Sequence, residues 1–217
     1  MVETPRFWNR VGGAGGVVFF ASLLVLIVLM PLSHSVSEPA FDAPSSAFLA
    51  YARSEANLPF ALSLVGVLGL FGFAVFAAVL TARFRAAENR SDVASTLVLL
   101  ATAIFVVLWL AELGLRSAET FRRGDLDATG AGVLFGLSNG IFVVSWSAVA
   151  AFLAASGFAA LRTRALLPWL GWSALVIGIG LFLAGADPLG AFWYLPYFLF
   201  YFWVLATSVV LLRSDPS

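Results

Sequence analysis

The chain has 217 residues, of which 61% are hydrophobic and 11% are charged, and its acidic and basic residues balance. Soluble domains carry about 25% charged residues, so this composition excludes an ordinary water-soluble surface and favours a membrane protein. The chain contains no cysteine and no lysine. This excludes disulfides, thiolate metal sites, cysteine nucleophiles and lysine Schiff bases.

The first apolar segment, 11–32, follows Arg6 and Arg10. A cationic stretch before an apolar core is also typical of a signal peptide, and Ser33 and Ser35 could serve a cleavage site. The segment is long for the core of a signal peptide and long enough to cross a bilayer. We therefore favour an uncleaved first membrane span over a signal peptide.

The polar loop 33–57 contains the only histidine, His34, and one amphipathic stretch. Within residues 46–56 of this loop, Phe48, Tyr51 and Ala52 fall on one side of a helix. The pattern predicts a short helix lying at the membrane interface.

Five further apolar segments follow this loop. The segment from Val93 to Ala111 carries no charge, and at 1.5 Å per residue its length crosses a hydrocarbon core of about 30 Å. The other segments are also long and apolar enough to cross the hydrocarbon core. Together they predict an all-α, polytopic membrane protein with one six-helix domain. The six spans are expected at 11–32, 58–82, 93–114, 129–161, 168–186 and 190–212.

The arginines indicate the orientation of these spans. With six spans both termini share one side, and the segments expected on that side hold eight of the twelve arginines. Cytoplasmic segments carry the excess of basic residues, so both termini are expected inside and the 33–57 and 115–128 segments outside. Use of arginine without lysine, with abundant alanine, glycine and valine, is typical of GC-rich bacterial coding. The expected location is the bacterial cytoplasmic membrane.

Glu112 and Arg116 end the third span, one helical turn apart. A carboxylate at membrane depth is a candidate functional group. Glu112 also lies close to the expected membrane boundary, where a charged side chain can reach water at little cost. A structural pair is favoured, and a proton or ligand site is the alternative.

Glycines recur every four residues in the fourth span, at Gly132, Gly136 and Gly140. In lipid such a stripe lets two helix backbones approach closely. Helix packing inside one bundle is the favoured interpretation, and docking on a second membrane protein is the alternative. Either way, Gly136→Leu is expected to be more damaging than Ser138→Ala.

In the sixth span, Tyr194, Tyr197 and Tyr201 share one helix face. They predict an aromatic cavity between the third, fourth and sixth spans, suited to a flat or lipidic ligand; the alternative is that aromatic side chains fill the bundle. We expect Trp109 and Glu112 to stand level with Tyr194 and Tyr197. The expected ligand-binding residues are Trp109, Glu112, Arg116, Asn139, Tyr194, Tyr197 and Tyr201. Haem and metal sites need ligands that the chain lacks, so no metal and no cofactor are expected.

The G-x-S-x-G pattern at 136–140, on the fourth of six spans, resembles the rhomboid intramembrane proteases. Rhomboids pair this serine with a histidine on the sixth span. The sixth span here has no histidine. A serine without a base is a poor nucleophile, so Ser138 is expected to hydrogen-bond to a neighbouring helix and the protein not to be an enzyme.

A second resemblance covers most of the chain. The short Ala-rich helix after the first span, the basic turn after the second and the sequence GFAALRTRALLPWLG at 157–171 are similar to an uncharacterised group of six-span bacterial membrane proteins with a domain of unknown function. This resemblance implies the fold and no activity.

These patterns favour a protein that binds or transports a lipid or small apolar ligand. The alternative is a structural or regulatory subunit that docks through its glycine face, and a rhomboid-like hydrolase is less favoured. Membrane lipids are the expected partners, together with a second membrane protein or another copy of the chain. No nucleic-acid partner is expected.

Overall fold

The computed structural model describes residues 5–32, 34–54, 59–88 and 92–213, and in these ranges the regular structure is helical. The prediction of an all-α protein is therefore confirmed for this part of the chain. The helices are α1 Pro5–Leu32, α2 Ser45–Arg53, α3 Pro59–Ala87, α4 Val93–Arg122, α5 Ala128–Thr163, α6 Pro168–Ala184, the 3₁₀-helix η1 Ala191–Trp193 and α7 Tyr194–Arg213.

Five of these helices, α1, α3, α4, α5 and α7, are long and apolar enough to cross a membrane. The sixth apolar helix, α6, has 17 residues. At 1.5 Å per residue it is about 26 Å long, slightly less than a hydrocarbon core of about 30 Å. α4 continues to Arg122. The helix therefore continues eight residues beyond 114, where the third span is expected to end.

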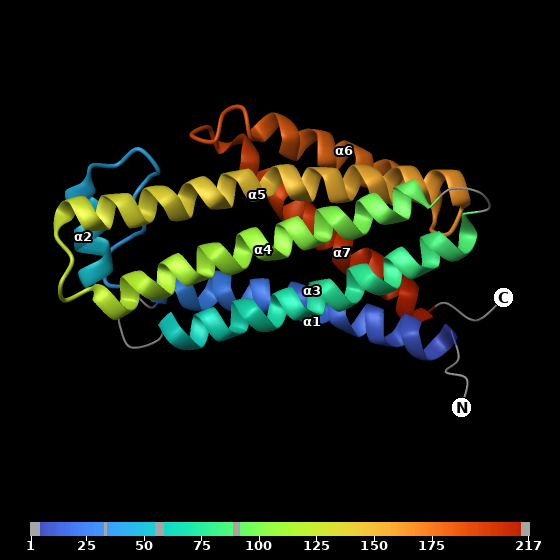
Figure 1. The fold of residues 1–217 in the computed structure, drawn as a ribbon, viewed down its shortest axis with the longest axis horizontal. Helices are drawn as coiled ribbons and strands as arrows, with labels where there is room; N and C mark the ends of the chain where they lie inside the picture. The colour runs from blue at the N-terminus through green and yellow to red at the C-terminus, as the bar shows by residue number, and fades with distance from the viewer. Residues whose placement is uncertain (1–4, 33, 55–58, 89–91, 214–217) are drawn as a thin grey trace.

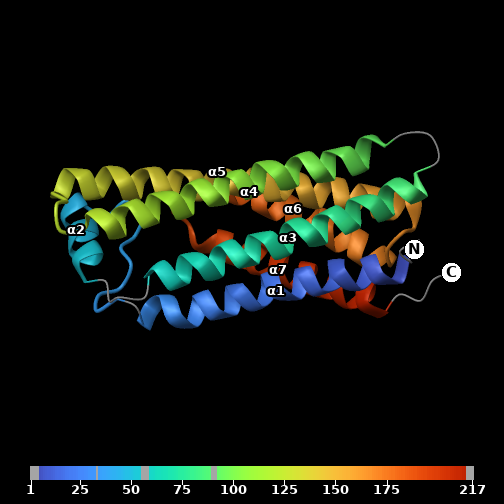
Figure 2. The ribbon, with the colours of Figure 1, turned by 60° about the horizontal axis from the view of Figure 1, so that its bottom comes forward.

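The long helices run side by side along one axis (Figures 1 and 2). α1 packs on α3 and α7, α4 packs on α3 and α5, and α6 packs on α5 and α7. Pro5 and Arg213 lie at the same end, which we call the terminal end (Figure 1). α2 lies at the opposite end, which we call the α2 end. There α4 and α5 extend beyond the turn between α6 and α7 (Figure 1).

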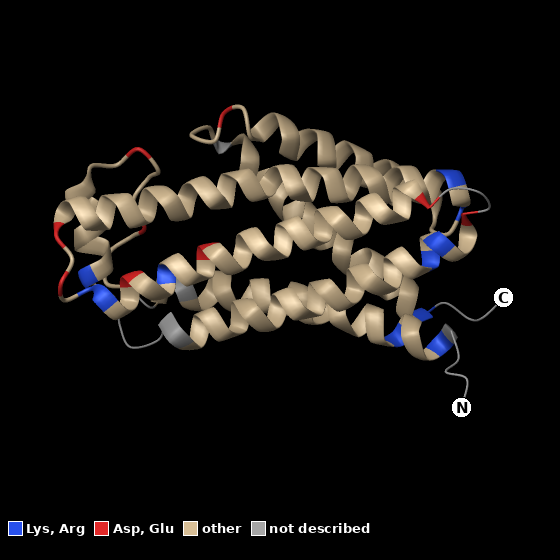
Figure 3. Ribbon diagram, in the orientation of Figure 1, with Lys and Arg blue, Asp and Glu red and all other residues tan. Residues whose placement is uncertain are grey.

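Charged residues gather at these two ends and leave the middle of the bundle almost free of charge (Figure 3). The arginines at the terminal end are Arg6, Arg10, Arg83, Arg85, Arg162, Arg164 and Arg213. Most of the carboxylates lie toward the α2 end, with Arg53, Arg116, Arg122 and Arg123. Such segregation is what a helical bundle surrounded by lipid requires, because charges are costly in the hydrocarbon core.

The closest helix contacts are made by glycines of α1. A Cβ atom on Gly15 would lie 2.6 Å from the carbonyl oxygen of Gly72 in α3, and one on Gly16 would lie 2.0 Å from Oγ of Ser208 in α7. Real Cβ atoms do not approach so closely, so only glycine lets α1 fit between α3 and α7. The sequence interpretation missed this role of the GGAGG stretch.

The predicted glycine face of α5 behaves differently. A Cβ atom on Gly132 would lie 2.3 Å from Oγ of Ser45, so α2 packs closely there. No described atom lies within 4 Å of a Cβ atom placed on Gly136 or Gly140. The favoured expectation of internal packing is therefore wrong for Gly136 and Gly140, which face outward.

The short helix α2 buries Phe48, Tyr51 and Ala52, the three residues that the sequence places on one face. They pack against Ala131 and Phe135 in the first turns of α5. This apolar contact holds α2 against the end of the bundle.

Candidate ligand-binding site

Glu112 is a buried carboxylate in α4, with 5% of the residue exposed. Its Oε1 accepts a hydrogen bond from Nε of Arg116, one turn along the same helix. The same oxygen accepts a second hydrogen bond from Oγ of Ser138 in α5, at 3.2 Å. The ion pair and the hydroxyl compensate the loss of hydration of the carboxylate and connect α4 to α5.

Arg116 joins this buried group to the surface. Its Nη1 and Nη2 each lie 3.4 Å from Oε1 of Glu38, in the segment before α2. The side chain of Arg116 is 25% exposed and that of Glu38 is 43% exposed. The guanidinium therefore connects an inner carboxylate, Glu112, with an outer one, Glu38.

Two of the three predicted tyrosines lie near this ion pair. Tyr197 and Tyr201 are buried in α7, and their hydroxyl oxygens are 3.0 Å apart. Tyr197 lies within electrostatic range of Glu112 and Arg116. Tyr194 is 51% exposed and stacks on Trp193. The structure thus brings Glu112, Arg116 and Tyr197 together, whereas Tyr194 lies outside the group.

Asn139 is buried in α5, directly after Ser138. The i, i+3 spacing places it on the same side of α5 as Phe142. Asn139 therefore belongs to the layer of α5 that faces the centre of the bundle.

Aromatic rings occupy the space between α4, α5 and α7, where the sequence predicts a cavity. Phe142 of α5 packs edge-to-face on Trp109 of α4, with centroids 6.4 Å apart, and on Tyr197 of α7, at 5.4 Å. Phe105 of α4 meets Phe200 of α7 in the same way, at 6.0 Å. These arrangements are the favourable ones for aromatic pairs, so the rings fill and stabilise this part of the core.

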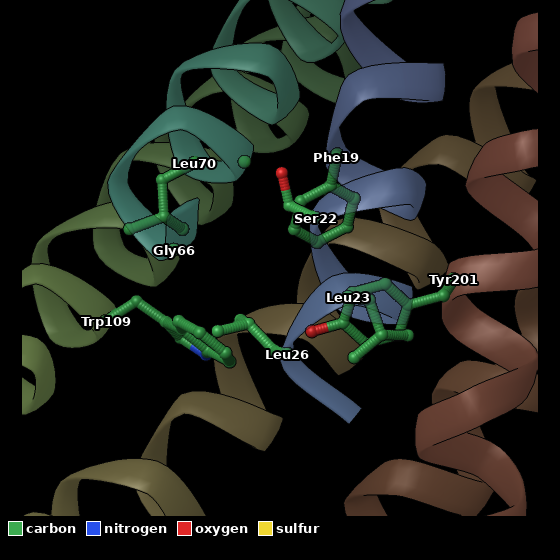
Figure 4. A pocket seen from close by; sticks show the side chains of 9 residues that line it. Phe19, Ser22, Leu23, Leu26, Gly66, Leu70, Trp109 and Tyr201 are labelled. Carbon is green, nitrogen blue, oxygen red and sulfur yellow. The ribbon is translucent and has the colours of Figure 1, made fainter. Parts of the chain in front are cut away.

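A groove lies on the other side of Trp109 and Tyr201, between α1, α3, α4 and α7 (Figure 4). Its cavity volume is small, about 10 Å³, which is room for about one water molecule. Its lining is apolar apart from three groups, the Ser22 hydroxyl, the Trp109 indole N–H and the Tyr201 hydroxyl. The lining residues are Phe19, Ser22, Leu23, Leu26, Gly66, Gly69, Leu70, Trp109 and Tyr201.

The Trp109 indole offers this groove an unused hydrogen-bond donor. Its Nε1 is buried and has no acceptor among the described residues. A buried N–H without a partner is uncommon, because its lost hydration costs about 1–3 kcal/mol. An acceptor on a bound molecule would remove this cost.

A second small groove, with a cavity volume of about 10 Å³, lies farther toward the α2 end between α3 and α4, lined by Ser63, Ser117, Thr120 and Phe121. Leu113 separates the two grooves, because its side chain lies 3.2 Å from a Cβ atom placed on Gly66. Small residues at 63, 66 and 69 therefore line one side of both grooves. Their three-residue spacing places them on one side of α3.

Comparisons of the chain with protein-family models, with curated proteins and with solved structures find no match. The two family resemblances therefore stay predictions, and the site rests on its geometry. In that geometry the hydroxyl of Ser138 bonds to Glu112, and the ring of His34 stacks on Tyr51 at 3.9 Å.

Proposed function

We propose that the chain is a six-span protein of the bacterial cytoplasmic membrane that binds or transports a lipid-like ligand, without a catalytic step. The observation that carries this proposal is the groove beside Trp109, in which a buried indole N–H has no acceptor among the described residues. A lipid-like ligand packed against this apolar lining could supply a carbonyl or hydroxyl oxygen as the missing acceptor of the indole N–H.

The lining of the groove, and not its depth, favours a hydrocarbon chain. Its cavity volume is about 10 Å³, room for about one water molecule. Gly66 and Gly69 line it on α3, and leucines form much of the remaining wall. A hydrocarbon chain packed along this apolar surface needs no further polar partner.

The membrane arrangement supports the same proposal. α6 packs along α5, which supports counting it with the turn before η1 as the sixth crossing of the proposal. Seven described arginines lie at the terminal end, and by the positive-inside rule they support a cytoplasmic position for that end. The groove then lies in the half of the bundle nearer the outer surface.

Quenching of tryptophan fluorescence by dibromostearate tests the proposal, because bromine atoms quench a neighbouring indole. The purified protein in detergent is expected to show a saturable quenching component on titration. This component should disappear in Trp109→Phe. It should persist in the control Trp172→Phe, which removes an exposed indole from α6. Saturable quenching that survives in Trp109→Phe would refute binding in the groove.

A second candidate function is docking on another membrane helix through α5. Gly136 and Gly140 are exposed and have open space above them, as a helix-docking face requires. Because the chain has no cysteine, Gly136→Cys introduces a single thiol. A disulfide cross-link to a second copy or another protein in native membranes would support docking. Its absence, with a thiol that still reacts with maleimide, would count against it.

A further inference from the structure

The turn between α5 and α6 contains a backbone conformation that favours glycine. Arg164 has φ 57° and ψ 22°, in the left-handed region, and no other non-glycine residue in the described ranges has a positive φ. Its N–H donates to the carbonyl oxygen of Ala160 and so ends α5. Glycine or asparagine usually occupies such a position, because a Cβ atom is unfavourable there. An arginine at a position that favours glycine indicates a role for its side chain outside the turn.

Neighbouring helices hold this turn in place. Arg83 of α3 donates a hydrogen bond from Nε to the carbonyl oxygen of Ala165, at 2.9 Å. Trp203 of α7 donates from Nε1 to the carbonyl oxygen of Leu170, in the first turn of α6, at 2.8 Å. Leu166 between these two contacts is buried. The inner side of the turn is therefore fixed, and its outer side is presented in one arrangement.

Arginines and indoles gather on the outer side of the turn. Arg162 and Arg164 are exposed at the end of α5. Trp169 and Trp172 lie three residues apart on α6, share one side of it and are 55% and 63% exposed. Tryptophan is enriched at the headgroup level of membranes, where one part of the ring meets apolar chains and the N–H meets polar groups. The turn therefore places two guanidinium groups at the depth of the lipid headgroups.

The positive charge at this end is not balanced within the described part of the chain. Seven described arginines lie at the terminal end, with two described carboxylates, Glu88 and Asp92 (Figure 3). Glu88 accepts a hydrogen bond from Ser95. No ion pair joins Arg162 or Arg164 to a carboxylate among the described residues. A guanidinium presents its nitrogens as a planar fork that matches the oxygens of a phosphate.

We propose that the α5–α6 turn binds the headgroup phosphate of an anionic phospholipid in the adjacent leaflet. Arg162 and Arg164 bind the phosphate oxygens, and Trp169 and Trp172 pack on the glycerol and the upper part of the acyl chains. An anionic lipid is favoured over a zwitterionic one, because the basic turn attracts negative charge and offers no described carboxylate to a cationic headgroup. This site is separate from the groove beside Trp109 and does not depend on the proposed function.

Arg164→Gly tests the inference. The protein is reconstituted in phosphatidylcholine vesicles that contain a small fraction of brominated phosphatidylglycerol or brominated phosphatidylcholine. The part of the tryptophan quenching that Trp172→Phe removes reports the lipid beside the turn. The wild-type chain should be quenched more by the brominated phosphatidylglycerol. Arg164→Gly should fold, because glycine adopts this conformation freely, and should lower the preference about fivefold, equivalent to the loss of one arginine–lipid contact.

Arg10→Gln is the matched control, because it removes one exposed arginine from the same end, on α1, which ends apart from the α5–α6 turn (Figure 1). It should leave the preference at Trp172 unchanged. Arg164→Asn also tolerates the left-handed conformation and should behave as Arg164→Gly. The inference is overturned if the wild-type chain shows no preference, if both substitutions of Arg164 retain it, or if Arg10→Gln lowers it as much. The quenching of Trp109 by dibromostearate tests the groove separately, so these outcomes would leave the proposed function standing.

Discussion

At the scale of single residues, the site is a charged group enclosed by apolar and aromatic side chains. Glu112 is tolerated there because Arg116 and Ser138 replace its hydration. Arg116 is in turn held in place by Glu112. Removing the charge of Glu112 and removing the hydroxyl of Ser138 should therefore lower the stability by different amounts. Single substitutions can measure each amount separately.

Glu112→Gln is expected to lower the free energy of unfolding by about 1–3 kcal/mol, the range for hydrogen bonds that involve a charged group. The amide still accepts a hydrogen bond from Arg116, so the bundle should fold. Ser138→Ala should cost less than about 1 kcal/mol, because hydrogen bonds between membrane helices average about 0.6 kcal/mol. Thermal unfolding in detergent measures both changes. A larger loss for Ser138→Ala than for Glu112→Gln would contradict this ranking.

At the scale of helices, packing depends on which glycines meet another backbone. Gly15 and Gly72 let α1 and α3 touch, and Gly157 and Gly171 do the same for α5 and α6, where an added Cβ would lie 2.7 Å from a carbonyl oxygen. Gly136 has no such neighbour among the described residues. The sequence-based expectation of severe damage at Gly136 is therefore replaced by a prediction with the opposite ranking.

Gly136→Leu should change the free energy of unfolding by less than about 1 kcal/mol. A Cβ atom at this exposed position meets no described atom within 4 Å, and a helix favours leucine over glycine by a similar amount. Gly15→Leu should abolish the folded protein, because its side chain would overlap the α3 backbone. Folded yield after size-exclusion chromatography distinguishes the two variants. Loss of folded Gly136→Leu, with Gly15→Leu intact, would show that the helix contacts are assigned wrongly.

The helices themselves could be predicted because long apolar segments have few alternatives in lipid. The face of α2 was also predictable, since Phe48, Tyr51 and Ala52 follow helical periodicity. Periodicity identifies a face but not the neighbour that covers it. The outward direction of Gly136 and the exposure of Tyr194 could therefore not be predicted without knowing how the helices are arranged. The same holds for the groove beside Trp109, because residues of four helices line it.

At the scale of the whole molecule, the different charges of the two ends indicate how the bundle is oriented across the membrane. This orientation determines which leaflet lies beside the groove. The terminal end carries arginine at the ends of α1, α3, α5 and α7, and the α2 end carries most of the carboxylates (Figure 3). By the positive-inside rule the terminal end is expected in the cytoplasm, so the groove beside Trp109 is expected in the half of the bundle nearer the outer surface. The orientation of the bundle therefore decides which leaflet supplies the ligand.

Single-cysteine labelling can determine this orientation, because the chain contains no cysteine of its own. Asp125 lies in the exposed turn after α4, at the α2 end. Asp125→Cys should react with a membrane-impermeant maleimide in intact cells, since positive-inside places this turn outside. Ser217→Cys should react only after the membrane is permeabilised. Reaction of Ser217→Cys in intact cells, with protection of Asp125→Cys, would invert the orientation and place the groove in the cytoplasmic half of the bilayer.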